Sequence, residues 1–211
     1  MRIAVLGATG GIGRHIVTQA LHDGHTVTAA VRDPARLGLN HPRLTVARAD
    51  ALDPASLKDV VAGTDAVLSG IGAAGRRDPL KPASASARAA AEAMAATGTR
   101  RVLVVSAGPL NRTGAGQSFA AHRVWRPLLW RILRDTYSDL EVMERVLRDS
   151  GLEWTAVRPP RLTDRPGTGR YRYEVDAGPR GTSVPRADVA RAMLDFIGVA
   201  ETVARPVGVS A

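Results

Sequence analysis

The chain has 211 residues and no cysteine, which excludes disulfides, thiolate catalysis and cysteine-bound zinc. Apolar residues make up 45% of it, and no apolar run is long enough to span a membrane. The net charge of +9 comes from arginines scattered along the sequence, with few aromatic residues and no basic tail. Nucleic-acid binding is therefore not expected, and an anionic cofactor with an anionic or aromatic small-molecule substrate explains the charge as well.

The same features bound the organisation of the protein. The length fits one domain over residues 1–211, and the five histidines have no metal-ligand spacing, so no metal is expected. No charged-then-apolar leader precedes the first strand, so we expect the mature chain to begin at Met1 and to be cytoplasmic. The oligomeric state is left open between monomer and homodimer.

The first 33 residues predict the element around which the fold is organised. A short apolar run over 2–6 reads as a strand, a helical pattern covers 12–21, and a second strand follows at 26–31. Between the first strand and the helix lies the turn GATGGIG, residues 7–13. A strand, a glycine turn, a helix and a second strand in this order predict a dinucleotide-binding unit.

The three glycines have separate physical roles. Gly7 allows a tight turn, Gly10 lets the backbone approach a pyrophosphate, and Gly13 lets the helix pack closely on the sheet. The free amides and the dipole at the start of the helix then face negative phosphates. A turn that serves packing alone does not explain three glycines at this spacing.

The residue after the second strand predicts which cofactor binds. NAD enzymes usually place an acidic residue there for the ribose hydroxyls, but this chain has Arg32, whose donors suit a 2′-phosphate. Asp33 is one place later and is expected to cap a short helix that begins at Pro34. NADPH is therefore favoured over NADH.

Beyond this unit the sequence continues to alternate between strands and helices. We expect strands at 44–47, 66–69, 101–106 and 154–158, and helices at 53–61, 82–97 and 135–150. The last fifty residues predict a strand at 171–175, a helix at 187–197 capped near Ser183 or Asp188, and an edge strand at 206–209. The fold class is α/β, a Rossmann-like doubly wound parallel sheet with helices on both faces and a small C-terminal substrate-side region.

Ligands of such sheets bind beyond the carboxyl ends of the strands. This rule places on one rim the glycine turn, Arg32, Asp50, Gly70–Gly72, Ser106 and Pro159–Leu162. Substrate-side elements are expected at about 107–134 and 159–186.

With these residues in view, the chain resembles the atypical short-chain dehydrogenase/reductase superfamily, through GATGGIG, VRD and SGLEWTAVRPP. Within it the chain is similar to the NADPH-dependent flavin reductase / biliverdin-IXβ reductase type, through VRDPARL, DAVLSGIG, VLRDSGLEWTAVRPPRLTD and GRYR. The resemblance implies an NADPH-binding Rossmann domain with a shallow substrate site over the nicotinamide. It also implies cofactor contacts at Gly7, Thr9, Gly10, Ile12, Gly13, Arg32, Asp50, Ala51, Gly72, Ser106, Pro159, Pro160 and Leu162, to which the glycine turn and the rim add Gly11 and Gly70.

The chain departs from the pattern of the superfamily at the catalytic positions. The usual Tyr-x-x-x-Lys pair is matched by Tyr137 and Glu141, and a carboxylate beside a tyrosine raises the pKa of the phenol. Ordinary Ser-Tyr-Lys carbonyl reduction is therefore in doubt. Where the flavin reductase type has a histidine, this chain has Glu144, and the segment after Ser106 is longer and carries Trp125 and Trp130.

Several residues are candidates for catalysis or substrate binding. Tyr137, Glu141 and Glu144 share a helix face, which is either a wall of the site or a solvated face with Glu141–Arg145 and Glu144–Arg148 pairs. Ser106, Tyr137 and Glu144 are the catalytic candidates, and Trp125 and Arg161 are the substrate candidates. The segment HRVWRPLLWRIL, residues 122–133, is a lid, ordinary packing, a subunit contact or a membrane-surface helix.

The function expected from these residues is an NADPH-dependent reductase that passes hydride to a small conjugated acceptor, such as a flavin, quinone or related heterocycle. Such a ring takes hydride and collects its proton from solvent, so a tuned tyrosine is unnecessary. Two alternatives stay open: a non-catalytic NADPH-binding redox sensor, and a ketone reductase or epimerase with a relocated acid.

Overall fold

The computed structural model describes residues 1–72, 78–111 and 131–211. Its main sheet has eight strands in the order β3-β2-β1-β4-β5-β6-β10-β8, and all neighbouring strands are parallel except β10 and β8. A smaller parallel sheet pairs β7 with β9. The strands are β1 (Arg2–Leu6), β2 (Thr26–Val31), β3 (Leu44–Arg48), β4 (Ala66–Ser69), β5 (Arg101–Val105), β6 (Glu153–Arg158), β7 (Arg161–Thr163), β8 (Arg172–Val175), β9 (Ser183–Pro185) and β10 (Arg205–Ser210).

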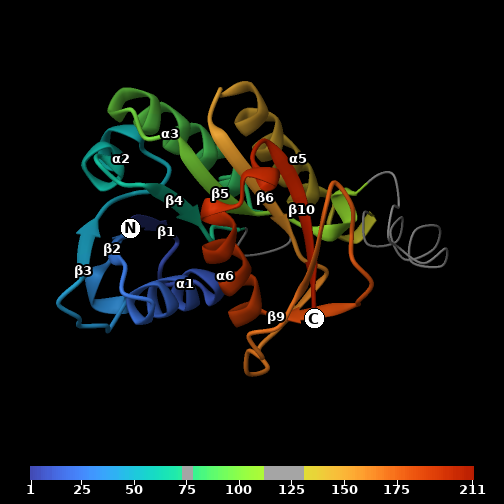
Figure 1. Ribbon diagram of the computed structural model, residues 1–211. Coiled ribbons are helices and arrows are strands. Elements are labelled where there is room, and N and C mark those ends of the chain that lie inside the picture. The colour runs from blue at the N-terminus through green and yellow to red at the C-terminus, as the bar shows by residue number, and fades with distance from the viewer. Residues whose placement is uncertain (73–77, 112–130) are drawn as a thin grey trace.

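Helices cover both faces of the main sheet, as Figure 1 shows. α1 (Gly11–His22) and α6 (Arg186–Asp195) lie on one face, and α2 (Pro54–Val61), α3 (Pro82–Thr97) and α5 (Arg134–Asp149) lie on the other. Each layer buries its own hydrophobic cluster against the sheet. Short 3-10 helices are η1 (Pro34–Arg36), η2 (Gly108–Leu110), η4 (Phe196–Gly198) and η5 (Ala200–Thr202). The α/β doubly wound fold expected from the sequence is confirmed.

Two predicted helix caps are present. The Asp33 carboxylate accepts a hydrogen bond from the amide of Ala35 at 3.1 Å, and the Asp53 carboxylate accepts one from Ala55 at 3.0 Å. In both helices proline follows the cap, where its missing N–H costs nothing. Short sequence signals therefore predict these helix starts correctly.

Two predictions for the C-terminal region are wrong. The strand at 205–210 is not an edge strand, because β10 lies between β6 and β8. The helix there begins at Arg186 after Pro185, and neither Ser183 nor Asp188 caps it. Ser183 belongs to β9, and the buried Asp188 carboxylate accepts hydrogen bonds from the amides of Thr168 and Gly169 at 2.9 Å each. Asp188 therefore fixes the preceding loop.

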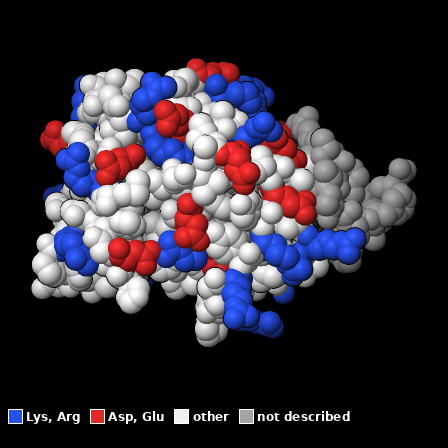
Figure 2. Space-filling model, viewed as in Figure 1, with Lys and Arg blue, Asp and Glu red and all other residues white. Residues whose placement is uncertain are grey.

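Charged side chains of one sign do not gather into one large patch on the face seen in Figure 2. Figure 2 shows basic and acidic side chains interspersed over it. Within the described ranges, no helix combines the length and apolar content that crossing a membrane requires.

Candidate nucleotide-binding site

The order of strands in the main sheet reverses between β1 and β4. In open α/β sheets, the crevice outside the carboxyl ends of the strands at such a reversal is where ligands bind. Here the glycine turn follows β1 and Gly70 follows β4, and the two strands pair in register from Ile3 and Ala66 to Leu6 and Ser69. The two segments that the sequence marks for a nucleotide therefore lie side by side.

The glycine turn is packed too tightly for any side chain at its first and last glycines. Gly7 has a φ of +73°, which favours glycine, and a Cβ built on Gly13 would lie 2.1 Å from the carbonyl oxygen of Gly7. A Cβ on Gly70 would lie 2.9 Å from the amide nitrogen of Gly13. The steric need for glycine at positions 7 and 13 is confirmed, and their contact with a cofactor stays a prediction.

The start of α1 suits an anion. Gly10 is its N-cap residue, no side chain caps the helix, and its first turn contains no acidic residue. Thr9, Gly10 and Gly11 are exposed, so solvent and ligands reach the first amides, which have no acceptor within the helix. The residues present thus fit the pyrophosphate of a dinucleotide.

The predicted adenosine end lies on two neighbouring strands. Arg32 follows β2 and is exposed, and Asp50 follows β3 and is also exposed. The amide of Ala49 donates to the carbonyl of Val31 at 2.9 Å, so the two strand ends run together. The Asp50 carboxylate accepts a hydrogen bond from the amide of Leu52 at 3.0 Å, while Ala51 is half-buried beside it.

A buried polar network occupies the carboxyl ends of β5 and β6. The Ser106 hydroxyl, directly after β5, donates to Glu144 Oε1 at 2.6 Å. Arg158, the last residue of β6, donates through Nε to the same oxygen at 2.9 Å and through Nη2 to Oε2 at 2.5 Å. The Glu144 and Arg158 side chains are only 4% and 13% exposed. The carboxylate is thus held by three hydrogen bonds and a paired charge.

This network decides what Ser106 offers to a ligand. Its only proton is given to Glu144, so the hydroxyl can accept hydrogen bonds but has no donor left. The alternative in which Glu144 forms a solvated pair with Arg148 is wrong, because its partners are Ser106 and Arg158. The structure therefore brings two of the three catalytic candidates together.

The third catalytic candidate, Tyr137, lies on α5 seven residues before Glu144 and is 7% exposed. Burial raises the pKa of its phenol above the ordinary value of 10.0. From the sequence, such a rise in the pKa was expected from the Glu141 carboxylate. In the structure it comes from desolvation of the buried phenol instead. The phenol stays protonated at neutral pH and is a weak acid.

The predicted nicotinamide end divides between the two sheets. Pro159 is buried and its carbonyl accepts from the amide of Gly108 at 2.8 Å, while Pro160 is half-buried. Leu162 is half-buried on β7, and Arg161 is exposed on the same strand. Trp125 and Trp130 lie outside the described residues, and so does most of the segment 122–133. The described residues contain no group of three or more His, Cys, Asp or Glu side chains that could hold a metal ion.

Sequence reasoning missed two arginines. Arg158 was seen only as the end of a strand, and nothing local shows that it reaches Glu144, fourteen residues earlier. Arg186 begins α6, and its side chain lies against Gly11, where an added Cβ would be 2.8 Å from the arginine Cδ. The proline just before it, at the end of a strand of three residues, was the available signal for that helix start.

A doubly wound sheet with a glycine turn at the strand reversal defines a nucleotide-binding Rossmann-like protein. The model of the NAD(P)H-binding family matches residues 7–198, so the chain belongs to that family. The fold is shared with a wide-type short-chain dehydrogenase/reductase from Veillonella parvula solved with NADP, at 22% identity, a TM-score of 0.82 and coverage of 100% of this chain and 94% of that one. It is also shared with the oxidoreductase ylbE from Lactococcus lactis, at 17% identity, a TM-score of 0.81 and coverage of 100% and 90%.

Relatives by sequence carry less specific descriptions. The chain is 28% identical to the uncharacterized sugar epimerase YhfK of Bacillus subtilis over 92% of this chain and 86% of that protein. It is 38% identical to an isoflavone reductase homologue of Zea mays over 34% of this chain, and the match spans about a quarter (26%) of the maize protein. The family model and the neighbour solved with NADP support a nicotinamide cofactor, and the names of the relatives do not agree on one acceptor.

Proposed function

We propose that the protein is an NADPH-dependent oxidoreductase of the flavin reductase / biliverdin-IXβ reductase type, which reduces a small conjugated acceptor such as a flavin, quinone or related heterocycle. The observation that carries the proposal is the commitment of the Ser106 proton to Glu144, a carboxylate already paired with Arg158. Together with Glu141 in the position of the usual lysine, it leaves the standard acid set incomplete. A ring acceptor needs no such acid, since water can protonate it.

The roles of the chain follow from this arrangement. When bound, the nicotinamide supplies the hydride. The glycine turn and the first amides of α1 would hold the phosphates, and Ser106, whose proton goes to Glu144, would offer its lone pairs to the carboxamide of the cofactor. Pro159, Pro160 and Leu162 would line the nicotinamide end and exclude water on one side of it. The protein then contributes position and a cationic rim for an anionic or aromatic substrate.

The preference for NADPH rests on Arg32. Replacing Arg32 by alanine is expected to lower the affinity for NADPH about tenfold to a hundredfold, because a charge-assisted contact to the 2′-phosphate is lost. The affinity for NADH, which has no 2′-phosphate, should stay within about twofold of wild type. Fluorescence titration of both cofactors measures this. The exposed Arg36, four residues later, provides the control variant Arg36→Ala. Equal weakening of both cofactors in Arg32→Ala would exclude a role in their discrimination.

The ring-acceptor mechanism makes a prediction for the buried tyrosine. Tyr137→Phe is expected to keep turnover of FMN or a quinone within about threefold of wild type, with NADPH affinity unchanged, because no proton from the phenol is used. The rate should also show no alkaline limb from this group at or below its ordinary pKa of 10.0. Loss of activity in this variant with intact cofactor binding would contradict the mechanism.

The Tyr137→Phe variant and the turnover of NADPH together separate the main proposal from its rivals. A sugar-epimerase-like or ketone-reducing activity, suggested by the name of the Bacillus subtilis relative, would need Tyr137 and a carbonyl or sugar substrate. A sensor would bind NADPH tightly, and NADPH would not be oxidised whichever acceptor is added. Neither pattern is expected here.

A further inference from the structure

Arg186 is held in place by the small sheet at the end of the chain. β7 and β9 pair in parallel with Thr163 opposite Pro185, so the next residues, Asp164 and Arg186, leave the sheet side by side. Arg186 Nη1 donates to Asp164 Oδ1 at 2.5 Å. The arginine side chain is 29% exposed and the aspartate side chain 89% exposed, so this pair lies at the surface.

The Arg186 side chain also crosses to the glycine turn. A Cβ built on Gly11 would lie 2.8 Å from Arg186 Cδ and 2.9 Å from its Nε, so the arginine rests on the first turn of α1. α6 and α1 lie together in Figure 1, and Gln19 Nε2 donates to the carbonyl of Ala187 at 2.8 Å. The packing of the two helices therefore fixes where the arginine can reach.

The guanidinium has capacity left for a ligand. It carries five N–H donors, and among the described residues its hydrogen-bond partner is Asp164 alone. It lies where α1 has neither a capping side chain nor an acidic residue in its first turn. A planar cation beside open helix amides is the arrangement that binds phosphate oxygens with directed hydrogen bonds.

We propose that Arg186 binds the pyrophosphate of the dinucleotide from above the glycine turn, with Asp164 holding the guanidinium over Gly11. The inference rests on the proposed use of the glycine turn as the cofactor site. It extends that site to the C-terminal helix, so the cofactor would bridge α1 and α6. Arg32 and Arg186 then serve different phosphates of one molecule, the 2′-phosphate and the pyrophosphate.

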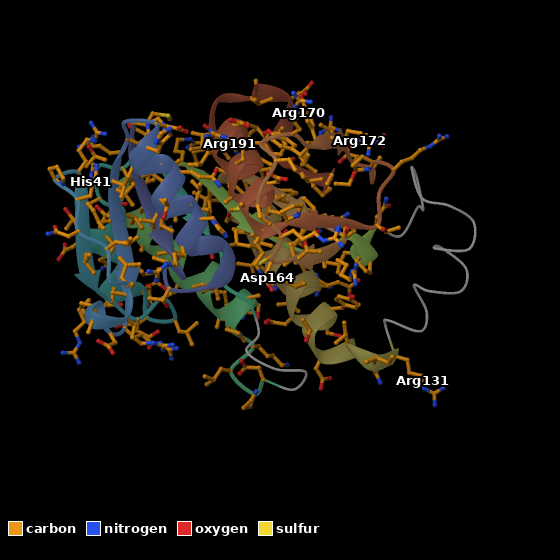
Figure 3. All side chains as sticks on the ribbon, turned by 90° about the horizontal axis from the view of Figure 1, so that it is seen from below. His41, Arg131, Asp164, Arg170, Arg172 and Arg191 are labelled. Carbon is orange, nitrogen blue, oxygen red and sulfur yellow. The ribbon has the colours of Figure 1, made fainter. Side chains whose placement is uncertain are left out.

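Binding measurements test this without turnover. Arg186→Ala is expected to lower the affinity for NADPH about tenfold to a hundredfold. The affinity for adenosine 2′-monophosphate, which has no pyrophosphate, should stay within about twofold of wild type. Arg186→Lys keeps the charge but loses the fork of donors, so an intermediate loss is expected. The exposed Arg170, far from Asp164 in Figure 3, gives the matched control Arg170→Ala, for which no change is expected.

A second variant moves the arginine without replacing it. The added methyl group of Gly11→Ala displaces the flexible Arg186 side chain from the turn. This variant is expected to lower the affinity for NADPH, as Arg186→Ala does, and to leave the melting temperature nearly unchanged. Circular dichroism first shows that the Arg186→Ala variant is folded. The inference is overturned if this variant binds NADPH with an affinity within about threefold of wild type, or if its affinities for NADPH and for adenosine 2′-monophosphate fall by the same factor. Failure of the ring-acceptor function has another signature: NADPH oxidation is absent while the Arg186 effect on binding remains.

Discussion

Glu144→Ala is expected to lower the free energy of unfolding by about 3–5 kcal/mol. The substitution removes the only carboxylate that pairs with Arg158 among the described residues and leaves a guanidinium with a 13% exposed side chain without its counter-charge. It also strips the Ser106 hydroxyl of its acceptor. Chemical denaturation of wild type and variant measures the difference.

Two further variants show whether the lost charge pairing is the cause. The exposed pair of Arg100 and Glu153 is the matched control, and Glu153→Ala should cost less than about 1 kcal/mol. The double replacement Glu144→Met with Arg158→Met should recover most of the stability lost in Glu144→Ala, because no charge remains buried. If the double variant is as unstable as Glu144→Ala, the cost arises from packing and not from the unpaired cation.

Gly13→Ala is expected to lower the free energy of unfolding by about 3 kcal/mol or more and to lower the affinity for NADPH by more than about tenfold. Its Cβ would lie 2.1 Å from the Gly7 carbonyl oxygen and 2.7 Å from the Gly7 carbonyl carbon, and both atoms belong to the backbone. The first turn of α1 must then move away from β1. The amides that face the phosphates move with it.

Gly198→Ala provides the control for this substitution, since nothing lies within 4 Å of a Cβ there. It should leave both stability and NADPH affinity nearly unchanged. Normal NADPH affinity in Gly13→Ala would show that the cofactor does not depend on the position of the α1 amides, and the proposed site would then be wrong.

The sequence predicts the fold well where local signals and topology agree. Strands with continuous apolar runs, such as 102–105 in β5, indicate a parallel sheet, and the caps at Asp33 and Asp53 fix two helix starts by local hydrogen bonds. The carboxyl ends of the parallel strands meet at one edge of the sheet, as expected, and the binding of a cofactor there stays a prediction. These inferences need only short-range chemistry and the parallel arrangement.

The polar contacts across the site could not be predicted, because they join distant residues. Glu144 is fourteen residues from Arg158 and thirty-eight from Ser106, while its helix spacing suggested a solvated pair with Arg148. Arg186 reaches Gly11 only because α6 packs on α1. Helix periodicity gives the face on which such a side chain lies, and the partner depends on tertiary packing.

The last strand, expected at the edge, lies inside the sheet and contains Pro206. Proline is usual on edge strands, because it has no N–H to donate to a neighbouring strand. In the structure the Pro206 carbonyl accepts from the amide of Asp176, just beyond the end of β8. In a strand, the backbone nitrogen and oxygen of one residue point to the same side. The Pro206 nitrogen therefore points toward the end of β8, and the missing N–H removes no hydrogen bond between β10 and β6. An interior strand therefore tolerates this proline.

The most direct test of the account is NADPH oxidation, followed by absorbance, with FMN and a quinone as acceptors. We expect turnover with at least one of these rings, faster with NADPH than with NADH at low cofactor concentration, and a loss of that preference in Arg32→Ala. Tight NADPH binding without oxidation by either acceptor would contradict the reductase and favour a protein that senses the cofactor.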